Sequence, residues 1–163
     1  MRKIGLVSDT HGFIDNKLLS FFAECDEIWH AGDMGNIKVA EILGNTKPFR
    51  GVFGNIDGTD VRTTFQEINQ FKCEEMNIWI IHIGGYPGNY TPKVKNLLED
   101  NKPDILVTGH SHILKVIYDK KFKLLQLNPG AYGKMGLHQV RTAVRFTIEQ
   151  TDIKDLEILE IPR

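Results

Sequence analysis

The sequence predicts a mixed α/β protein in which two mixed β-sheets form stacked layers flanked by helices. Three observations support this fold class. The chain has 163 residues, 41% of them hydrophobic, which suits one domain over residues 1–163 with a sizeable core. The first two-thirds alternates short apolar runs with helix-like segments. The last third contains only short strand-like runs separated by turn residues.

In the first two-thirds, short apolar runs bounded by polar residues are typical of buried strands. The expected strands cover residues 3–7, 27–30, 49–53, 63–71, 74–83 and 105–108. The helix-like segments between them cover residues 18–23, 39–43 and 92–100. Asp15 or Asn16 is expected to cap the first helix. Gly44 is expected to end the second, and Pro92 to lie in the first turn of the third.

The last third reads as a strand-rich tail. Its expected strands cover residues 115–118, 122–127, 140–149 and 156–161. Asp119, Lys120 and Lys121 would close a hairpin between the first two. Such a tail after an alternating start favours two mixed sheets flanked by helices. Because exposed strands in the tail could pair with a second copy, a homodimer stays open.

Charge and composition exclude several classes of protein. Twenty Lys and Arg against 21 Asp and Glu give a net charge of −1, so no basic field exists to hold long nucleic acid. No apolar run approaches the roughly 20 residues of a membrane span. The apolar stretch near the N-terminus, residues 4–7, is too short for a signal peptide. Two cysteines cannot form a disulfide framework. We therefore expect a cytoplasmic protein.

Polar side chains follow five of the expected strands. Asp9, Asp33, Asn55, His82 and His110 succeed one another at intervals of 22 to 28 residues. Parallel βα units need about 30 residues to return to the same sheet edge. The five strand ends are therefore expected to meet at one edge, where open α/β sheets bind ligands.

With His11 and His112, this set contains two Asp, one Asn and four His side chains. Oxygen and imidazole donors without thiolates suit manganese, iron, zinc, cobalt or nickel. Seven donors exceed the needs of one ion but suit two ions about 3.5–4 Å apart. Asp33 is the natural bridge. Two such ions activate water near neutral pH and neutralise charge on a phosphate oxygen. Gly32, Gly54 and Gly109 are expected to let the backbone turn sharply beside these ligands.

The motifs around these residues carry a family resemblance. They are Asp9-Thr10-His11, Gly32-Asp33, Gly54-Asn55-Ile56-Asp57, His82 and Gly109-His110-Ser111-His112. In order and spacing they resemble the five blocks of the calcineurin-like metallophosphoesterases, and most closely the small bacterial and archaeal phosphodiesterases. The resemblance extends from residue 3 to about residue 133 and includes Asn128-Pro129-Gly130, which resembles the NPG turn of that subgroup.

The resemblance implies a four-layer αββα sandwich of two mixed sheets, two divalent ions, and a role for each ligand. Asp9, His11, Asp33 and His112 would hold the first ion. Asp33, Asn55, His82 and His110 would hold the second. Manganese is the metal expected first, with iron, zinc, nickel and cobalt as alternatives. Asn55 and Asn128 are expected to contact the substrate, and a metal-bridging hydroxide is expected to attack the phosphorus.

The chain departs from the family pattern at two positions. Larger members have His where this chain has Ile56, which cannot donate a proton. Because general acids contribute about 10²–10⁴-fold, we expect a preference for diesters or activated aryl esters over alkyl monoesters. The second departure is Ile83, which gives His-Ile-Gly-Gly where a His-Gly pair is common and leaves the orientation of His82 open.

Other polar residues have simpler interpretations. His30 lies inside an expected strand and suits a packed or supporting position better than a ligand. His138 has no spacing argument. Asp57 could orient a neighbour in the site or cap the next segment, and Asp33 could cap the helix near residue 37. Neither a dinucleotide fingerprint nor a Walker motif is present.

The sequence therefore favours a dinuclear metal-dependent phosphodiesterase that acts on a small-molecule phosphodiester. The alternative is a catalytically weak or inactive scaffold for protein–protein interaction on the same fold. The retromer subunit that resembles these phosphoesterases also lacks the catalytic His and serves as a protein-binding platform. A nuclease is disfavoured by the small size and near-neutral charge.

Overall fold

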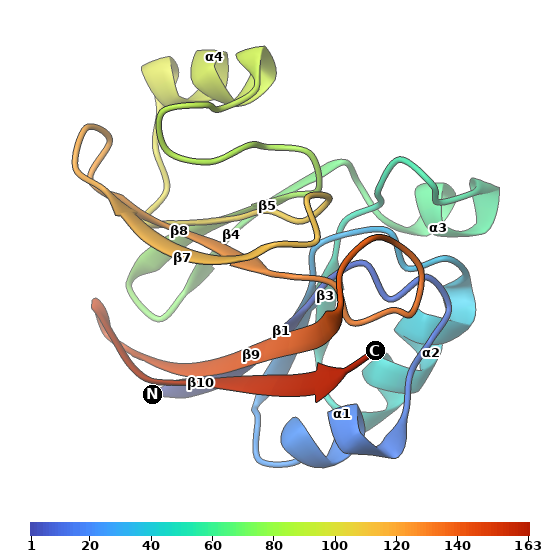
Figure 1. The fold of residues 1–163 in the computed structure, drawn as a ribbon. Coiled ribbons are helices and arrows are strands. Elements are labelled where there is room, and N and C mark those ends of the chain that lie inside the picture. Colours follow the sequence, from blue (N-terminus) through green and yellow to red (C-terminus); the bar gives the residue numbers. More distant parts are fainter.

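The computed structural model describes residues 1–163, which form two five-stranded mixed sheets stacked face to face (Figure 1). The first sheet has the order β10-β9-β1-β2-β3. Its strands are β1 (Arg2–Val7), β2 (Glu27–His30), β3 (Phe49–Gly51), β9 (Val140–Glu149) and β10 (Asp152–Pro162). β1, β2 and β3 run parallel, whereas β9 and β10 add antiparallel.

The second sheet has the order β4-β5-β6-β8-β7. Its strands are β4 (Ile68–Cys73), β5 (Met76–Ile81), β6 (Ile105–Val107), β7 (Leu114–Asp119) and β8 (Leu124–Pro129). β5, β6 and β8 run parallel, and the antiparallel strands β4 and β7 form the two edges.

Helices cover the outer faces of the sandwich. α1 (Asn16–Phe21) and α2 (Ile37–Thr46) lie beneath the first sheet in Figure 1, and α4 (Pro92–Asp100) lies above the second. α3 (Thr59–Thr64) lies on the connection between the two sheets. The expected αββα architecture is confirmed. None of the four helices has the length and the apolar composition that a membrane-spanning helix needs.

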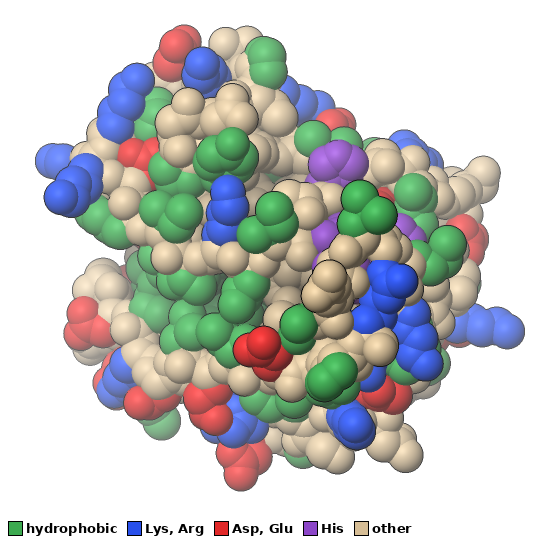
Figure 2. Space-filling model, viewed as in Figure 1, with side chains coloured by type: hydrophobic (Ala, Val, Ile, Leu, Met, Phe, Trp, Pro, Cys, Tyr) green, Lys and Arg blue, Asp and Glu red, His purple; other side chains and the backbone are tan.

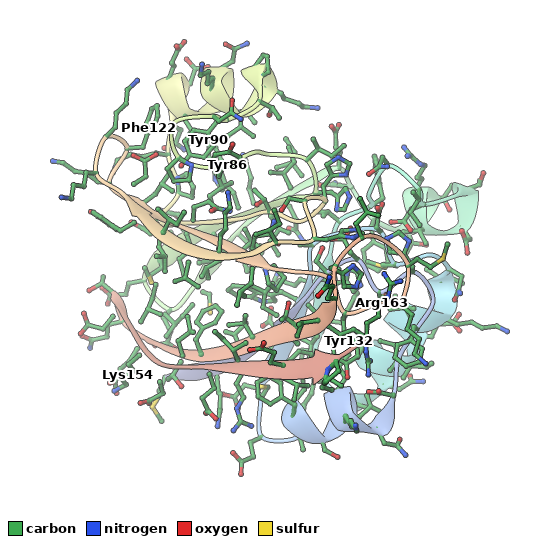
Figure 3. All side chains as sticks on the ribbon, viewed as in Figure 1. Tyr86, Tyr90, Phe122, Tyr132, Lys154 and Arg163 are labelled. Carbon is green, nitrogen blue, oxygen red and sulfur yellow. The ribbon has the colours of Figure 1, made fainter.

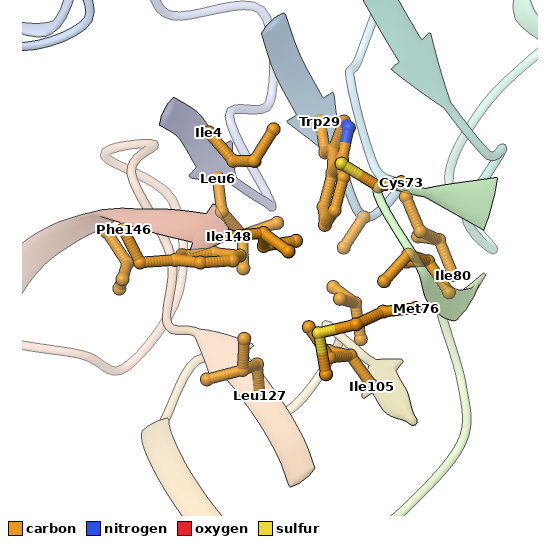
Figure 4. Close-up of a cluster of buried hydrophobic side chains, with 14 of the residues drawn as sticks. Ile4, Leu6, Trp29, Cys73, Met76, Ile80, Ile105, Leu127, Phe146 and Ile148 are labelled. Carbon is orange, nitrogen blue, oxygen red and sulfur yellow. The ribbon is translucent and has the colours of Figure 1, made fainter. Parts of the chain in front are cut away.

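Strand alternation explains why four layers form. On β5, Ile78 and Ile80 point into the apolar cluster between the sheets, whereas Trp79 and Ile81 pack with α4. Successive strand residues face opposite sides of a sheet, so an unbroken apolar run must be covered on both faces. The cluster between the sheets contains 15 buried residues, including Trp29 and Phe146, which approach edge to face (Figure 4).

Two helix predictions are corrected. Gly44 does not end α2, which continues to Thr46. The N-cap of α2 is Asn36, whose side chain accepts from the Lys38 amide, and not Asp33. Of the two residues expected to cap α1, Asp15 is the N-cap, and its side chain accepts a hydrogen bond from the Leu18 amide.

The predicted strand over residues 63–71 is wrong in its first part. Residues Thr59–Thr64 form α3, and the strand begins at Ile68. β-branched threonines favour strands as isolated residues. Here the hydroxyls of Thr63 and Thr64 bond back to carbonyl groups of the preceding helical turn, and buried Val61 belongs to the apolar cluster that also includes residues of α1 and α2.

The expectation that five strand ends meet at one edge of one sheet is also wrong. β1, β2 and β3 belong to the first sheet, whereas β5 and β6 belong to the second. Both sheets nevertheless direct the carboxyl ends of these strands to the same side of the sandwich. The polar residues that follow the strands therefore meet where the two sheets adjoin.

Candidate metal centre

Histidine side chains gather where the two sheets adjoin (Figure 2). The loops after β1, β2 and β3 contribute Asp9, His11, Asp33 and Asn55, and the loops after β5 and β6 contribute His82, His110 and His112. The structure brings together all seven residues that the sequence proposed as ligands. Six of them form two groups of three whose ligand atoms lie within 4.8 Å of one another.

The first group contains Asp9, His11 and His112. Asp9 Oδ1 lies 3.1 Å from His112 Nε2 and 3.8 Å from His11 Nε2. The other oxygen of Asp9 accepts hydrogen bonds from the Ser8 hydroxyl and the His110 amide. One oxygen therefore anchors the carboxylate, and the other faces the two imidazoles.

The second group contains Asp33, His82 and His110, with Asn55 beside it. Asp33 Oδ2 lies 3.2 Å from His82 Nε2, and Asp33 Oδ1 accepts from the Ile56 amide at 3.0 Å. Asn55 Oδ1 lies 3.0 Å from both His82 Nε2 and His110 Nδ1.

Asp33 connects the two groups. Its Oδ2 atom is 3.8 Å from His11 Nε2 in the first group and 3.2 Å from His82 Nε2 in the second. This carboxylate oxygen faces imidazoles from both groups, and Asp9 Oδ1 does so less closely, at 3.9 Å from His82 Nε2. A ligand shared by two ions requires such a position.

The backbone at the site is in an unusual conformation. Nine non-glycine residues have positive φ, and five of them are proposed ligands: Asp9, His11, Asp33, His110 and His112. Non-glycine residues adopt this region rarely, and such strain concentrates at functional sites. The left-handed backbone conformation at these five residues therefore sets the direction of their side chains, although non-glycine residues adopt it rarely.

Three glycines adjoin the ligands, and the sequence predicted that all three allow sharp backbone turns. This prediction is corrected for two of them. Only Gly32 has the positive φ that sharp turning requires. A Cβ atom on Gly54 would lie 2.0 Å from Asp33 Oδ1, and one on Gly109 would lie 2.3 Å from Ser8 Oγ. Gly54 and Gly109 are therefore needed for space beside the two carboxylates and not for turning.

The charges of the site reinforce one another. Burial opposes ionisation of Asp9, but hydrogen bonding and the nearby imidazoles outweigh it and place the pKa of Asp9 well below its ordinary value. Burial also opposes ionisation of Asp33, but contact with His82 lowers the pKa of Asp33. The Asp9 carboxylate is the main cause that raises the pKa of His11. The carboxylates thus remain charged and attract cations.

The donor set fits divalent ions. His11 Nε2 is buried and has no hydrogen-bond partner, which a coordinated cation would remedy. The Ala31 carbonyl lies 2.7 Å from His82 Nδ1. A proton on that nitrogen leaves His82 Nε2 free as a ligand, which is a common arrangement at metal sites.

Residues outside the ligand set position its loops. Asp57 accepts hydrogen bonds from the backbone amides of Met34, Gly35 and Gly54. Of the two interpretations of Asp57, orientation of the site is the one that this geometry supports, because it ties the Asp33 loop to the Asn55 loop. Arg62 donates to the carbonyl groups of Gly54, Asn55 and Asp57.

The other polar and apolar residues named in the sequence analysis lie beside the ligands or at the surface. Buried His30 lies beside Thr10, with its Nε2 atom 2.9 Å from the hydroxyl oxygen. His138 packs edge-on against His112, with ring centroids 5.0 Å apart. Ile56 and Ile83 are partly exposed. Asn128 donates to the Gly109 carbonyl and Ser111 hydroxyl, so it holds the His110 loop, and its contact with a substrate stays a prediction.

Sequence reasoning missed two contributions. Arg62 lies in α3, directly before the strand that was expected over residues 63–71, and its contacts depend on how the loop after β3 folds back. Gln126 on β8 is fully buried and lines a cavity of about 370 Å³ beside His110. No local pattern marks either residue, because their partners lie on other elements.

Comparisons with known proteins agree with this geometry. The family model for the calcineurin-like phosphoesterase superfamily domain matches residues 2–151. A probable metallophosphoesterase of Methanothermobacter thermautotrophicus is 28% identical over 136 residues, which cover 78% of this chain and 76% of that protein.

Solved structures share the fold over almost the whole chain. A novel archaeal phosphodiesterase aligns with a TM-score of 0.75 at 20% identity and covers 96% of this chain and 99% of its own. Vps29 from Entamoeba histolytica, solved with zinc, aligns with a TM-score of 0.74 at 16% identity, with 98% of each chain covered. Because the family model covers nearly all of the sequence and the fold agrees, the chain belongs to the calcineurin-like phosphoesterase superfamily.

Proposed function

We propose that this protein is a dinuclear metal-dependent phosphodiesterase that hydrolyses small-molecule phosphodiesters. The observation that carries the proposal is the pair of adjoining ligand groups connected through Asp33. Two divalent cations, when bound, would supply positive charge for the phosphate and activate water near neutral pH. Manganese is the first candidate metal. The archaeal phosphodiesterase with the same fold supports the choice of a diester substrate.

In this proposal each ligand keeps the role that the family resemblance implies. Asp9, His11 and His112 would hold one ion, and Asn55, His82 and His110 the other, with Asp33 shared. The anchoring hydrogen bonds to Asp9 and Asp33 keep one oxygen of each carboxylate directed into the site. Prior placement of the ligands avoids reorganisation when substrate binds.

Substitution of Asp33 tests the metal site directly. Asp33→Asn removes the shared charge, and we expect it to lower hydrolysis of bis(p-nitrophenyl) phosphate in Mn²⁺ by at least about 100-fold, as loss of metal affinity would require. Metal content should fall with it, as measured by elemental analysis. Asp100→Asn, on the exposed face of α4, is the matched control and should retain both. Full activity and full metal content in Asp33→Asn would refute the proposal.

The exposed side chain at Ile56 leads to a substrate preference. Because Ile56 cannot protonate a leaving group, esters with good leaving groups should be favoured. We expect the Mn²⁺-loaded protein to cleave aryl diesters faster than alkyl monoesters, as measured by release of the aryl alcohol and of inorganic phosphate. Faster cleavage of the alkyl monoesters would contradict this part of the proposal.

A protein-binding scaffold is the second candidate function. It is favoured by the hydrophobic atoms that Figure 2 shows in the notch between the two halves of the molecule. Exposed apolar side chains also lie on the edge strands of both sheets, with Val116 and Tyr118 on β7 and Ile158 on β10. The same hydrolysis assay separates the two functions. A scaffold would show no turnover of aryl diesters with or without Mn²⁺, and Asp33→Asn would then change nothing.

A further inference from the structure

A cavity of about 370 Å³ opens beside His110, outside the two ligand groups. It lies between the loop after β5, which includes Tyr86 and Tyr90, and the strands β7 and β8. Figure 3 shows Tyr86 and Tyr90 between α4 and this strand pair. The volume of the cavity is within the range of about 300–1,000 Å³ that is typical of small-molecule sites. A molecule in this cavity would contact the metal centre through His110.

Gln126 gives the cavity an unused hydrogen-bond acceptor. Its side chain is fully buried on β8, and its Nε2 atom donates to the Thr108 hydroxyl at 2.8 Å. Its Oε1 atom is buried and has no hydrogen-bond partner. An unpaired buried acceptor costs about 1–3 kcal/mol, so its presence in the lining of a cavity points to a ligand that donates to it.

The lining of the cavity carries positive charge and no negative charge. No carboxylate lines it, and Lys115 is the only lysine or arginine that does. The Lys115 ammonium lies 3.5 Å from the centroid of the Tyr86 ring, so a cation–π contact holds it at the cavity wall. The cavity therefore suits a neutral or anionic molecule.

We propose that this cavity binds the nucleoside portion of a phosphodiester substrate, with an N–H group of the base donating to Gln126 Oε1. The phosphate would lie at His110, so the inference rests on the function proposed above. Amide and aromatic side chains together are the means by which proteins recognise unpaired bases. Here Gln126 and Asn89 provide amides, and Tyr86 and Tyr90 provide aromatic rings. A simple alkyl or phenyl ester would leave Gln126 unpaired.

Two esters that share a leaving group test the proposal by turnover. Thymidine 5′-(p-nitrophenyl) phosphate carries a base with an N–H donor, whereas methyl p-nitrophenyl phosphate carries none. For Gln126→Met we expect the ratio of kcat/KM between the nucleoside and methyl esters to fall about tenfold, as the loss of one buried hydrogen bond predicts. Gln70→Met, at an exposed position on β4 outside the cavity, should keep the wild-type ratio.

A second variant keeps the test valid if Gln126→Met fails to fold. Tyr86→Ala lies in a loop and is partly exposed, and it should lower the same ratio. An unchanged ratio in the folded variants would overturn the proposal, as would an equal loss for both esters.

A binding experiment tests the cavity without turnover. Thymidine 5′-monophosphate added to chelator-treated protein should shift the NMR signals of the Gln126 side-chain amide and the Tyr86 ring. Ribose 5-phosphate, which lacks the base, should shift them much less. Equal shifts with both compounds would overturn the proposal. If neither ester is hydrolysed but the selective shifts persist, the phosphodiesterase function fails while the nucleoside site stands.

Discussion

The Asp9 and Asp33 carboxylates divide their two oxygens between two tasks. In each residue one oxygen accepts hydrogen bonds from neighbouring backbone or hydroxyl groups, and the other faces imidazoles. Both residues also have positive φ. The Asp and His residue types were chosen from the sequence, but their divided hydrogen bonding could not be, because most of it depends on partners more than 20 residues away, which are His110, Ile56, His112 and His82.

His30 makes the stability of the protein depend on pH. Burial lowers the pKa of His30 to about 3, and the Gly32 amide donates to its Nδ1 atom, which must therefore be unprotonated. In the unfolded chain His30 takes up a proton as the pH falls below about 6.5, whereas in the folded chain it stays neutral down to about pH 3. The stability that the neutral, buried His30 contributes is therefore fully present above pH 6.5 and is lost as the pH falls towards 3. Between pH 6.5 and pH 5 we expect it to lower the free energy of unfolding by about 2 kcal/mol.

Urea unfolding of metal-free protein at pH 6.5 and pH 5 measures this effect. His30→Asn should remove about that much of the pH dependence, whatever its effect on stability at a single pH. His11 and His82, whose pKa values are raised, act in the opposite direction and are unchanged in the variant. Parallel stability curves for the two proteins would show that His30 carries none of the dependence.

At the scale of elements, the site is built from strand ends and the loops after them. The loop after β8 supports the end of β1, because the amides of Tyr132 and Gly133 donate to the carbonyl groups of Ser8 and Asp9. The same loop reaches α1, because the Tyr132 hydroxyl donates to Asp15, the N-cap residue of α1, at 2.6 Å. A helix cap and a metal-ligand loop are thus joined through one tyrosine.

Substitution of Asp15 should therefore destabilise more than one element. Asp15→Ala removes the bond to the Leu18 amide and the contacts with Tyr132 and Arg141. We expect a loss of about 2 kcal/mol in the free energy of unfolding, measured by denaturant titration. Asp15→Asn can still cap the helix and should lose less. Equal losses for the two variants would mean that capping contributes nothing at this position.

At the scale of the whole molecule, the candidate metal centre lies across the two sheets. Asp9, His11, Asp33 and Asn55 come from the first sheet, and His82, His110 and His112 from the second. A ligand that contacts both sheets favours the folded state, because the unfolded chain cannot bring these residues together.

Metal binding should consequently raise the midpoint of thermal unfolding. At a free Mn²⁺ concentration of about 100 times Kd the stabilisation is about 2.7 kcal/mol, which corresponds to about 5–10 °C for a chain of this size. Differential scanning calorimetry with Mn²⁺ and with chelator measures the shift. Asp33→Asn should show a much smaller one. Identical midpoints for wild-type protein in the two conditions would contradict a metal centre across the sheets.

Most of the elements could be predicted because apolar periodicity is a local property. The strands at residues 27–30 and 140–149 have the expected boundaries, and α4 begins at Pro92 as expected. The prediction failed at α3, where hydroxyl bonds and the burial of Val61 outweighed the strand preference of threonine. It also failed at Gly44, whose φ is not positive, so that α2 continues through it to Thr46.

The sequence by itself determined the donor atoms, their order along the chain and the strands that carry them, because these depend on residue type and local spacing. Only the tertiary structure decided that the donors come from two sheets, that Gly54 and Gly109 provide room for carboxylates, and that Gln126 lines a cavity beside His110. These features depend on strand pairing and side-chain packing between distant segments. No local pattern encodes them, since each is a contact between residues that the chain brings together only when it folds.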